Sequence, residues 1–200
     1  FIKSAQIAGS EGIMNYLGFI IDIAPGPAML VHPNVLAAKA WVQEKLNPNI
    51  EDNAALSEKV VEYKSREGGS TALFKKFPGG FLVITGANSA AALRQKSIRY
   101  LIKDDWDEWP LDIGGQGDPD KMANARQIGF HDSGTAKCFE VSTPTVKSVS
   151  RVTRAYEESD QRIFKVRCPH CEEAQELRFF PLKNDKERFR GGLKFNTTKP

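Results

Sequence analysis

The sequence has few of the features that mark membrane, secreted or repetitive proteins. Only three of its 200 residues are cysteines. No apolar run approaches the roughly 18 residues that a membrane span requires, and the first residues lack the basic flank, long apolar stretch and cleavage site of a signal peptide. We find no internal repeat and no low-complexity segment. These absences argue against a disulfide framework, a membrane span and a repeat array, and they favour a soluble protein of a reducing, cytoplasmic setting.

An excess of positive charge is also nearly absent. Lysine and arginine total 28 and aspartate and glutamate 25, which gives a formal net charge of +3. This excess is too small to indicate a nucleic-acid partner by itself, although the last fifty residues are visibly more basic than the first hundred. With 40% hydrophobic and 26% charged residues, the chain can bury a normal core. Its length suits one domain, or one domain with a small appendage.

Apolar runs and turn signals predict an α/β domain over residues 1–161. The expected elements are a helix, a strand, a helix with Asn34 as its cap, a hairpin that turns at Pro78-Gly79-Gly80, and two further strands. They span residues 11–23, 28–33, 34–46, 71–87, 99–105 and 136–145. Because helices and strands mix along the chain, we expect a sheet with helices on its faces.

The pattern changes after residue 161. Two short β-like pieces, RIFKVRC and AQELRFF, flank the sequence Cys-Pro-His-Cys at 168–171. They predict a small second unit over residues 162–200. Because the chain begins on what looks like the end of a strand and ends in KFNTTKP, we expect both ends to be boundaries within a longer protein.

The opening stretch FIKSAQIAGSEGIMN is similar to a phosphate loop whose lysine is displaced. In the usual pattern, G-x-x-x-x-G-K-[ST], backbone N–H groups surround the phosphates, the lysine reaches the β and γ phosphates, and the hydroxyl binds Mg²⁺. Here Ser10 stands at the hydroxyl position, Gly9 where the lysine usually stands, and Lys3 at the first glycine. Whether Lys3 takes over the missing role stays open. The candidate nucleotide-binding residues are Lys3, Ser4, Ala5, Gln6, Ile7, Ala8, Gly9, Ser10 and Glu11.

Two carboxylates follow an apolar run in YLIKDDWDEWP. Carboxylates at the carboxyl end of a central strand lie at the edge where α/β folds bind ligands. Asp104 is expected to hold Mg²⁺ together with Ser10, and Asp105 to orient the attacking water. An ordinary acidic loop after a strand is the alternative.

A polar strand end completes the order of motifs. Ser142 and Thr143 begin STPT directly after the apolar strand CFEV. In motor NTPases such a strand end senses the γ-phosphate and relays hydrolysis to the parts that bind substrate, so both residues are candidates for coupling. Ser-Thr-Pro also makes an ordinary exit from a strand. The order of loop, acidic strand end and polar strand end favours the functional interpretation of all three.

Six stretches together resemble one family. They are KSAQ at 3–6, GANS and LRQKSIRYL within 86–101, DDWDEWP, GDP at 117–119, STPT, and SDQRIFKVRCPHC at 159–171. The resemblance, which covers almost the whole chain, is to the large terminase subunit of tailed phages, the lambda-like branch. It implies a P-loop NTPase fold of the RecA-like motor type that uses ATP and Mg²⁺.

The same resemblance implies an activity and partners. The family's large subunit is an ATPase motor that packages double-stranded DNA into a procapsid in the host cell cytoplasm. The implied partners are double-stranded DNA, the small terminase subunit, the portal protein and further copies of the same subunit, with no membrane. The family's nuclease domain is separate, and cleavage is not assigned to this chain.

Three departures from the family pattern bear on catalysis. Ala8-Gly9-Ser10 stands where most relatives have G-K-T, Asp105 replaces a glutamate, and Lys103 interrupts a strand position that is usually apolar. Because a missing charge weakens transition-state stabilisation in phosphoryl transfer, we expect slow hydrolysis with nucleotide binding retained. The alternatives are a non-hydrolysing scaffold that binds nucleotide or DNA, and a helicase-like ATPase.

Two further features have a functional and a plain interpretation. Arg94, in the LRQKS stretch, is a candidate catalytic contact to phosphate or to a neighbouring subunit, and a solvated surface arginine is the alternative. Cys168 and Cys171 have the spacing of half a zinc ribbon, and the resemblance implies further cysteines downstream. A closed zinc site needs two more ligands, and the other candidates are distant: Cys138, His131, His32 and the intervening His170. Two reduced thiols are therefore the alternative.

Overall fold

A computed structural model describes residues 1–4, 7, 9–60, 70–146 and 148–176 of the chain. The chain separates into two compact units, Phe1–Tyr156 and Glu157–Pro200. The sequence places this boundary after residue 161.

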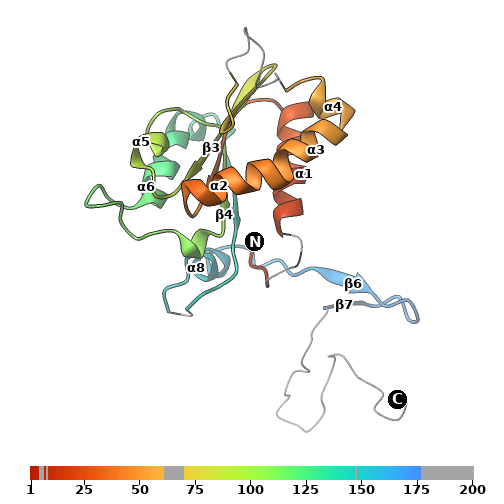
Figure 1. The fold of residues 1–200 in the computed structure, drawn as a ribbon. Helices are drawn as coiled ribbons and strands as arrows, with labels where there is room; N and C mark the ends of the chain where they lie inside the picture. The colour runs from red at the N-terminus through yellow and green to blue at the C-terminus, as the bar shows by residue number, and fades with distance from the viewer. Residues whose placement is uncertain (5–6, 8, 61–69, 147, 177–200) are drawn as a thin grey trace, which may run out of the picture. The chain divides into compact units, whose positions relative to one another are not determined.

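A mostly parallel sheet of five strands forms the centre of the first unit (Figure 1). The strands are β1 (Pro27–His32), β2 (Phe74–Phe77), β3 (Gly80–Gly86), β4 (Tyr100–Asp104) and β5 (Lys137–Val141). Their order in the sheet is β2-β3-β1-β4-β5, and only β2 is antiparallel to its neighbour. Ile2 forms an isolated parallel bridge with Ser142. The start of the chain therefore lies beside the end of β5.

Helices cover both faces of this sheet (Figure 1). The α-helices are α1 (Gly9–Asp22), α2 (Val35–Trp41), α3 (Asn47–Asp52), α4 (Ala54–Ser57), α5 (Ala90–Leu93), α6 (Pro119–Asn124), α7 (Ile128–His131) and α8 (Arg151–Glu157). A π-helical turn at Val42–Leu46 joins α2 to α3, and 3-10 turns lie at Trp106–Glu108 and Ala125–Gln127. The helices α1 to α4 contribute to one core cluster, whereas α5, α6 and α8 contribute to the other.

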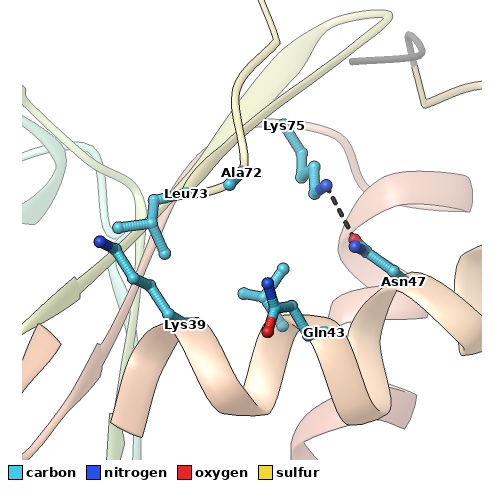
Figure 2. A pocket seen from close by; sticks show the side chains of 7 residues that line it. Lys39, Gln43, Asn47, Ala72, Leu73 and Lys75 are labelled. Atoms are coloured by element: carbon cyan, nitrogen blue, oxygen red, sulfur yellow. Dashed lines mark hydrogen bonds between the residues drawn. The ribbon is translucent and has the colours of Figure 1, made fainter. Parts of the chain in front are cut away.

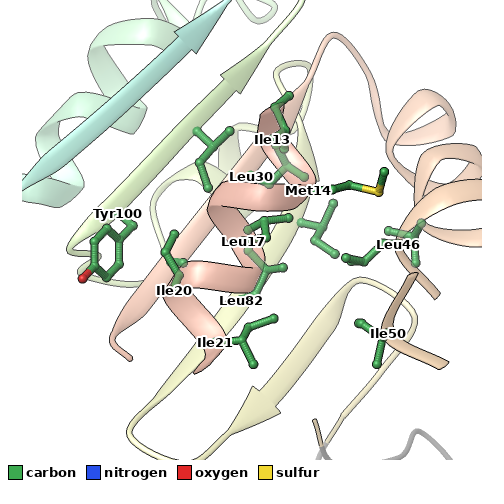
Figure 3. Close-up of a cluster of buried hydrophobic side chains, with 14 of the residues drawn as sticks. Ile13, Met14, Leu17, Ile20, Ile21, Leu30, Leu46, Ile50, Leu82 and Tyr100 are labelled. Atoms are coloured by element: carbon green, nitrogen blue, oxygen red, sulfur yellow. The ribbon is translucent and has the colours of Figure 1, made fainter. Parts of the chain in front are cut away.

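The core under α1 determines which side chains of the strands face that helix. Ile13, Leu17 and Ile20 recur at helical spacing on α1 and are fully buried, with Leu30 of β1 in the same cluster (Figure 3). Ile102 of β4 belongs to this cluster as well. Side chains alternate between the two faces of a strand. The residues two positions after Leu30 and Ile102 are the last residues of β1 and β4, so their side chains are directed to the α1 face.

The structure confirms the mixed α/β class and the predicted elements of the first unit. Asn34 caps α2, since its Oδ1 accepts a hydrogen bond from Ala37 N at 2.9 Å. The hairpin turns at Gly79, whose φ of 79° suits glycine. One strand is shorter than predicted, because β5 ends at Val141. No helix in the described part of the chain is long and apolar enough to cross a membrane.

The second unit contains a small antiparallel pair of strands. These are β6 (Lys165–Arg167) and β7 (Ala174–Glu176), with Arg167 opposite Ala174. Both fall within the predicted β-like pieces. The rest of the second predicted piece, from residue 177 onward, lies outside the described residues.

Candidate functional site

The candidate site lies where the parallel strands end. The strands β1, β4 and β5 all finish at one edge of the sheet, which is the edge where open α/β sheets bind ligands. The start of the chain reaches the same edge, because Lys3 N donates to Ser142 O at 3.1 Å and Ser142 N donates to Phe1 O at 3.3 Å. This pairing brings the first predicted motif next to the third.

The Lys3 ammonium joins three segments that are far apart in the sequence. Its Nζ lies 3.3 Å from Asp105 Oδ1 and 3.3 Å from Thr143 Oγ1. The Lys3 side chain is 13% exposed and the Asp105 side chain 41% exposed. A mostly buried cation therefore sits at the strand ends beside a carboxylate that is open to solvent.

Gly9 makes room for the Lys3 side chain. A Cβ atom added at Gly9 would collide with Lys3 Cδ and lie 2.6 Å from Lys3 Cε. The methylene stem of Lys3 thus passes over the residue where the lysine of a usual phosphate loop would be attached. Within this structure, a displaced lysine and a glycine at position 9 accommodate each other.

The remaining residues of the predicted loop are placed only in part. Gly9 is the buried first residue of α1, Ser10 is half-buried, and Glu11 is exposed. Ser4 and Ile7 are exposed, while Ala5, Gln6 and Ala8 lie outside the described residues. No hydrogen bond joins Ser10 to Asp104 among the described residues, although both belong to the α1 side of the sheet edge.

The two adjacent carboxylates have different environments. Asp104 is 6% exposed, its Oδ2 lies 3.2 Å from His32 Nδ1, and its backbone oxygen accepts a hydrogen bond from Trp109 Nε1 at 3.0 Å. Asp105 has a left-handed backbone, with φ 43° and ψ 49°. This conformation costs a non-glycine residue about 1 kcal/mol, and such strain concentrates at functional sites. The turn separates the pair, so one carboxylate faces His32 and the other faces Lys3.

Asp107 is a connecting residue whose role no sequence motif indicates. Its backbone N donates to Ser142 Oγ at 3.0 Å, while its carboxylate accepts from Thr145 N at 3.0 Å and from Val152 N at 2.9 Å. Burial alone would raise the pKa of Asp107, but hydrogen bonds from Ser150, Val152 and Thr145 outweigh it and lower the pKa. The turn after the acidic pair is therefore attached to the segment after β5 and to the start of α8.

Arg151 completes this connection from the side of α8. Its Nη1 donates to the backbone oxygens of Trp106 at 3.3 Å and Trp109 at 2.9 Å, and its Nη2 donates to Pro110 O at 3.0 Å. The carboxylate of Asp107 and the guanidinium of Arg151 thus fix the same turn through opposite charges. Asp107 lies within the DDWDEWP stretch, but no motif assigned a role to it or to Arg151, because both act through backbone groups of distant segments.

Lys103, which the sequence marked as an unusual strand residue, is part of a buried charge cluster. It is 1% exposed, and its Nζ lies 2.7 Å from Asp120 Oδ1 and 2.8 Å from Glu140 Oε1. Burial would lower the pKa of Lys103, but Cys138, Asp120 and Glu140 together raise it. Its side chain lies on the face of β4 opposite Asp104, so it neutralises an internal charge and does not join the edge site.

Arg94 is not brought to Lys3 and Asp105 by any contact among the described residues. It ends α5 and is exposed, and its guanidinium donates to Gln116 Oε1 at 3.3 Å and to Gln116 O at 3.1 Å. It lines an open cavity of about 520 Å³ together with Lys121 and Arg126.

A second cavity, of about 460 Å³, lies beside β2 (Figure 2). Lys39, Gln43 and Asn47 line it from the helical side, and Lys75 enters from β2, with its Nζ donating to Asn47 Oδ1 at 2.9 Å. Burial lowers the pKa of Lys75, and the nearby Glu51 opposes that shift. None of the predicted site residues lines this cavity.

The cysteine pair lies in the turn between β6 and β7. Cys168 N donates to Glu173 O at 3.0 Å, and Glu172 N donates to Cys168 O at 2.9 Å. Hydrogen bonds from the backbone N–H groups of Cys171 and His170, and from the Cys171 thiol, lower the pKa of Cys168. Across the described ranges no group of three or more His, Cys, Asp or Glu residues could hold a metal ion. The described residues therefore do not support zinc at this pair.

Comparison with known families decides the identity of the chain. The model of the family "Phage terminase large subunit gpA, ATPase domain" matches residues 1–196. The chain belongs to this family. The resemblance found in the sequence motifs is thereby confirmed.

Two curated relatives are terminase large subunits. The chain is 28% identical over 202 residues to that of Enterobacteria phage P21, which covers 100% of this chain and 30% of that protein. It is 28% identical over 181 residues to that of Escherichia phage lambda, which covers 89% of this chain and 28% of that protein. The chain thus spans less than a third of the length of these relatives.

A solved structure shares the fold. The ATPase domain of the large terminase of Thermus phage P74-26 matches with a TM-score of 0.57 at 14% identity, over 86% of this chain and 68% of that chain. At this identity the match supports the α/β architecture.

Proposed function

We propose that this chain is the ATP-hydrolysing motor part of a phage terminase large subunit that drives double-stranded DNA into a procapsid. Family membership and the two terminase relatives support this proposal. The observation that carries it is the convergence of Lys3, Asp105 and Thr143 at the carboxyl edge of a parallel sheet. Lys3, the acidic strand end and the polar strand end lie together there, and this arrangement supports a P-loop NTPase of the RecA-like motor type.

In this proposal Lys3 and the start of α1 bind the phosphates. A lysine supplies a compact charge on a flexible stem, and the stem of Lys3 already lies over Gly9. The first N–H groups of α1 have no partners within the helix, and the helix dipole favours an anion there. The displaced lysine therefore delivers its charge to the place that a lysine at position 9 would otherwise serve.

Ser10 and Asp104 are the proposed residues for Mg²⁺. Magnesium prefers oxygen ligands and is usually bound by one or two carboxylates together with substrate phosphates. A buried carboxylate at the strand end and a hydroxyl in the first turn of α1 fit this preference. When bound with the nucleotide, the ion neutralises charge that develops on the phosphate oxygens.

Asp105 is the proposed residue that orients and polarises the attacking water. Before nucleotide binds, its carboxylate is paired with the Lys3 ammonium. Phosphate oxygens compete for that ammonium, so nucleotide binding frees Asp105 Oδ1 to accept a hydrogen bond from water. Because aspartate is one methylene shorter than glutamate, we propose slow turnover as a property of this site.

Coupling is assigned to Ser142 and Thr143. Thr143 contacts Lys3, and Ser142 accepts a hydrogen bond from Asp107 N. Asp107 also binds the start of α8. Hydrogen bonds thus connect Lys3 to α8, the last helix of the first unit. A shift of Lys3 is transmitted along them.

The remaining assignments follow from family membership. We propose Arg94 as a contact to a neighbouring subunit in a homo-oligomer, because its exposed position leaves it accessible to another copy. We also propose the small terminase subunit and the portal protein as partners, and the host cell cytoplasm as the location. Zinc at Cys168 and Cys171 is proposed only together with further downstream cysteines, which residues 172–200 do not contain, so metal analysis of the 200-residue chain should find less than one equivalent.

A second candidate is a nucleotide-binding scaffold without hydrolysis, favoured by the absence of a lysine at position 9. Steady-state ATP hydrolysis by the full-length protein, with and without double-stranded DNA, separates the two. The motor predicts turnover that DNA stimulates and that Asp105→Asn abolishes. Nucleotide binding without turnover in the wild-type protein would favour the scaffold.

A further inference from the structure

His32 is a buried histidine at the end of β1, directly beside Asp104. Val31 pairs with Lys103 in the parallel register of β1 and β4, so the next residues, His32 and Asp104, are neighbours. Their side chains lie on the α1 face, with His32 Nδ1 3.2 Å from Asp104 Oδ2. The side chains are 3% and 8% exposed, respectively.

The surroundings of His32 would suit an apolar side chain. The two preceding residues of β1 on the same face are Ala28 and Leu30, both fully buried. The His32 ring packs against Trp41, with ring centroids 5.2 Å apart and an angle of 46° between the planes. His32 Nε2 is buried and has no hydrogen-bond partner among the described residues.

An imidazole at this position therefore destabilises the fold unless its other nitrogen makes a favourable contact. A buried polar group without a hydrogen-bond partner destabilises the fold, because it has lost its hydrogen bonds to water. An ionised carboxylate only accepts hydrogen bonds, so the nitrogen that faces it must carry a proton. The 3.2 Å contact with Asp104 thus requires a proton on Nδ1.

We propose that His32 is a positioning residue for the magnesium carboxylate: its Nδ1–H holds Asp104 Oδ2 and directs Oδ1 toward the metal. The inference rests on the role proposed for Asp104. Carboxylates that ligate metals are themselves usually held by hydrogen bonds, and loss of such a partner typically costs about 10–100-fold in metal affinity. A carboxylate ordered before nucleotide arrives loses less side-chain freedom when magnesium binds.

Two substitutions separate positioning from packing. His32→Phe keeps a ring of similar size against Trp41 and removes the donor. His32→Asn removes most of the ring and keeps a donor, since its Nδ2 is the same number of bonds from the backbone as histidine Nδ1. A role in positioning predicts that the asparagine variant works and the phenylalanine variant fails, whereas a role in packing alone predicts the reverse.

The experiment measures nucleotide affinity of the chain by calorimetry, using ADP with Mg²⁺ and ADP with EDTA. The ratio of the two dissociation constants is the magnesium effect. We expect His32→Phe to reduce this effect about tenfold with the EDTA value unchanged, and His32→Asn to stay within about threefold of wild type. An undiminished effect in His32→Phe, or an equal loss in both variants, overturns the proposal.

Asp104→Asn distinguishes failure of this inference from failure of the proposed function. If Asp104→Asn abolishes the magnesium effect and His32→Phe does not, only the role of His32 is wrong. If wild type shows no magnesium effect, the role of Asp104 is wrong and the role of His32 with it.

A measurement on the wild-type chain does not depend on whether the variants fold. The chain has three histidines, so ¹⁵N-labelled imidazole groups can be assigned by NMR, with substitution of the exposed His131 and His170 identifying the other two sets. We expect His32 to carry a proton on Nδ1. A proton on Nε2 with a bare Nδ1 overturns the proposal.

Discussion

The carboxyl edge of the sheet at Asp104 and Asp105, the acidic edge, and the cavity beside β2 each contain a lysine with little exposure. The two lysines have different partners. At the acidic edge, Lys3 Nζ lies beside the carboxylate of Asp105 and the hydroxyl of Thr143. Beside β2, the described hydrogen bond of Lys75 Nζ is to the neutral amide oxygen of Asn47. A carboxylate keeps an ammonium charged at low cost, whereas burial next to an amide disfavours the charge and lowers the pKa of Lys75.

This difference indicates which lysine is prepared to act on a ligand. Lys3 can exchange one anion for another, because phosphate oxygens can replace the Asp105 carboxylate. The described hydrogen-bond partner of Lys75 is a neutral amide, so no bound anion is there for phosphate to replace. The buried charge of Lys75 destabilises the fold.

The largest effect is expected from the acidic pair. Asp105→Ala should reduce ATP turnover by roughly 10²–10³-fold, while magnesium–nucleotide affinity stays equal or increases because Lys3 is released. Asp104→Ala should instead weaken magnesium–nucleotide binding. Steady-state hydrolysis and calorimetric binding measure the two effects. Glu108, an exposed acid of the same stretch, provides the control Glu108→Ala, and similar losses in both aspartate variants would refute the division of roles.

The next effect concerns the displaced lysine. Lys3→Ala should weaken nucleotide binding about 10–100-fold, since a charged hydrogen bond is worth roughly 1.5–3 kcal/mol. Gly9→Lys alone should not improve binding, because any side chain at position 9 collides with the Lys3 stem.

The double variant Lys3→Ala with Gly9→Lys sharpens this test. Removing the Lys3 stem vacates the space over residue 9, so a lysine there should restore part of the lost affinity. Lys137→Ala, an exposed lysine at the other end of β5, serves as the control. Normal binding by Lys3→Ala would mean that the loop does not hold phosphate.

A smaller effect is expected at Asp107, the link between the edge and α8. The pKa of Asp107 is lowered in the folded protein. Its ionised carboxylate therefore stabilises the fold at pH values above its ordinary pKa of 3.8, and this contribution is lost as pH falls through the folded pKa. Asp107→Asn should cost about 2 kcal/mol at pH 7 and progressively less in acid. Urea unfolding at several pH values measures this, with exposed Asp132→Asn as control. A cost independent of pH would exclude a role of the charge.

The smallest effect tests the other lysine. Lys75→Met should stabilise the first unit by about 1 kcal/mol at pH 7, because it removes a charge whose burial is unfavourable. The pKa of Lys75 in the folded protein lies below its ordinary value of 10.5. The destabilisation of the wild-type fold by this charge therefore decreases as pH rises through the folded pKa toward 10.5. Urea unfolding checks this, with Lys76→Met, exposed on the same strand, as control. Destabilisation by Lys75→Met would indicate that the amide contact outweighs the cost of burial.

Elements with strong local signals were predictable from the sequence. The apolar period of residues 11–23 gave α1, Asn34 gave a helix cap, and Gly79 gave the hairpin turn. The end of β5 was not predictable, because it depends on its partner. β4 turns away at the left-handed Asp105, so β5 has no strand to pair with beyond Val141.

The candidate site was predictable as a set of motifs but not as a geometry. The reach of Lys3 over Gly9 depends on the pairing of Ile2 with Ser142, which lies 140 residues further along the chain. The sequence offers His32 only as a distant zinc ligand, because nothing in it places this residue beside Asp104. Contacts of this kind arise from the order of strands in the sheet, which a single sequence specifies only through the complete fold.

The most direct test of the central claim is a crystal structure of the chain with magnesium and a non-hydrolysable ATP analogue. The account predicts that Lys3 Nζ lies within hydrogen-bonding distance of the β or γ phosphate and has left Asp105, while Asp104 is on the magnesium side. A nucleotide bound elsewhere, with Lys3 still paired with Asp105, would contradict the account.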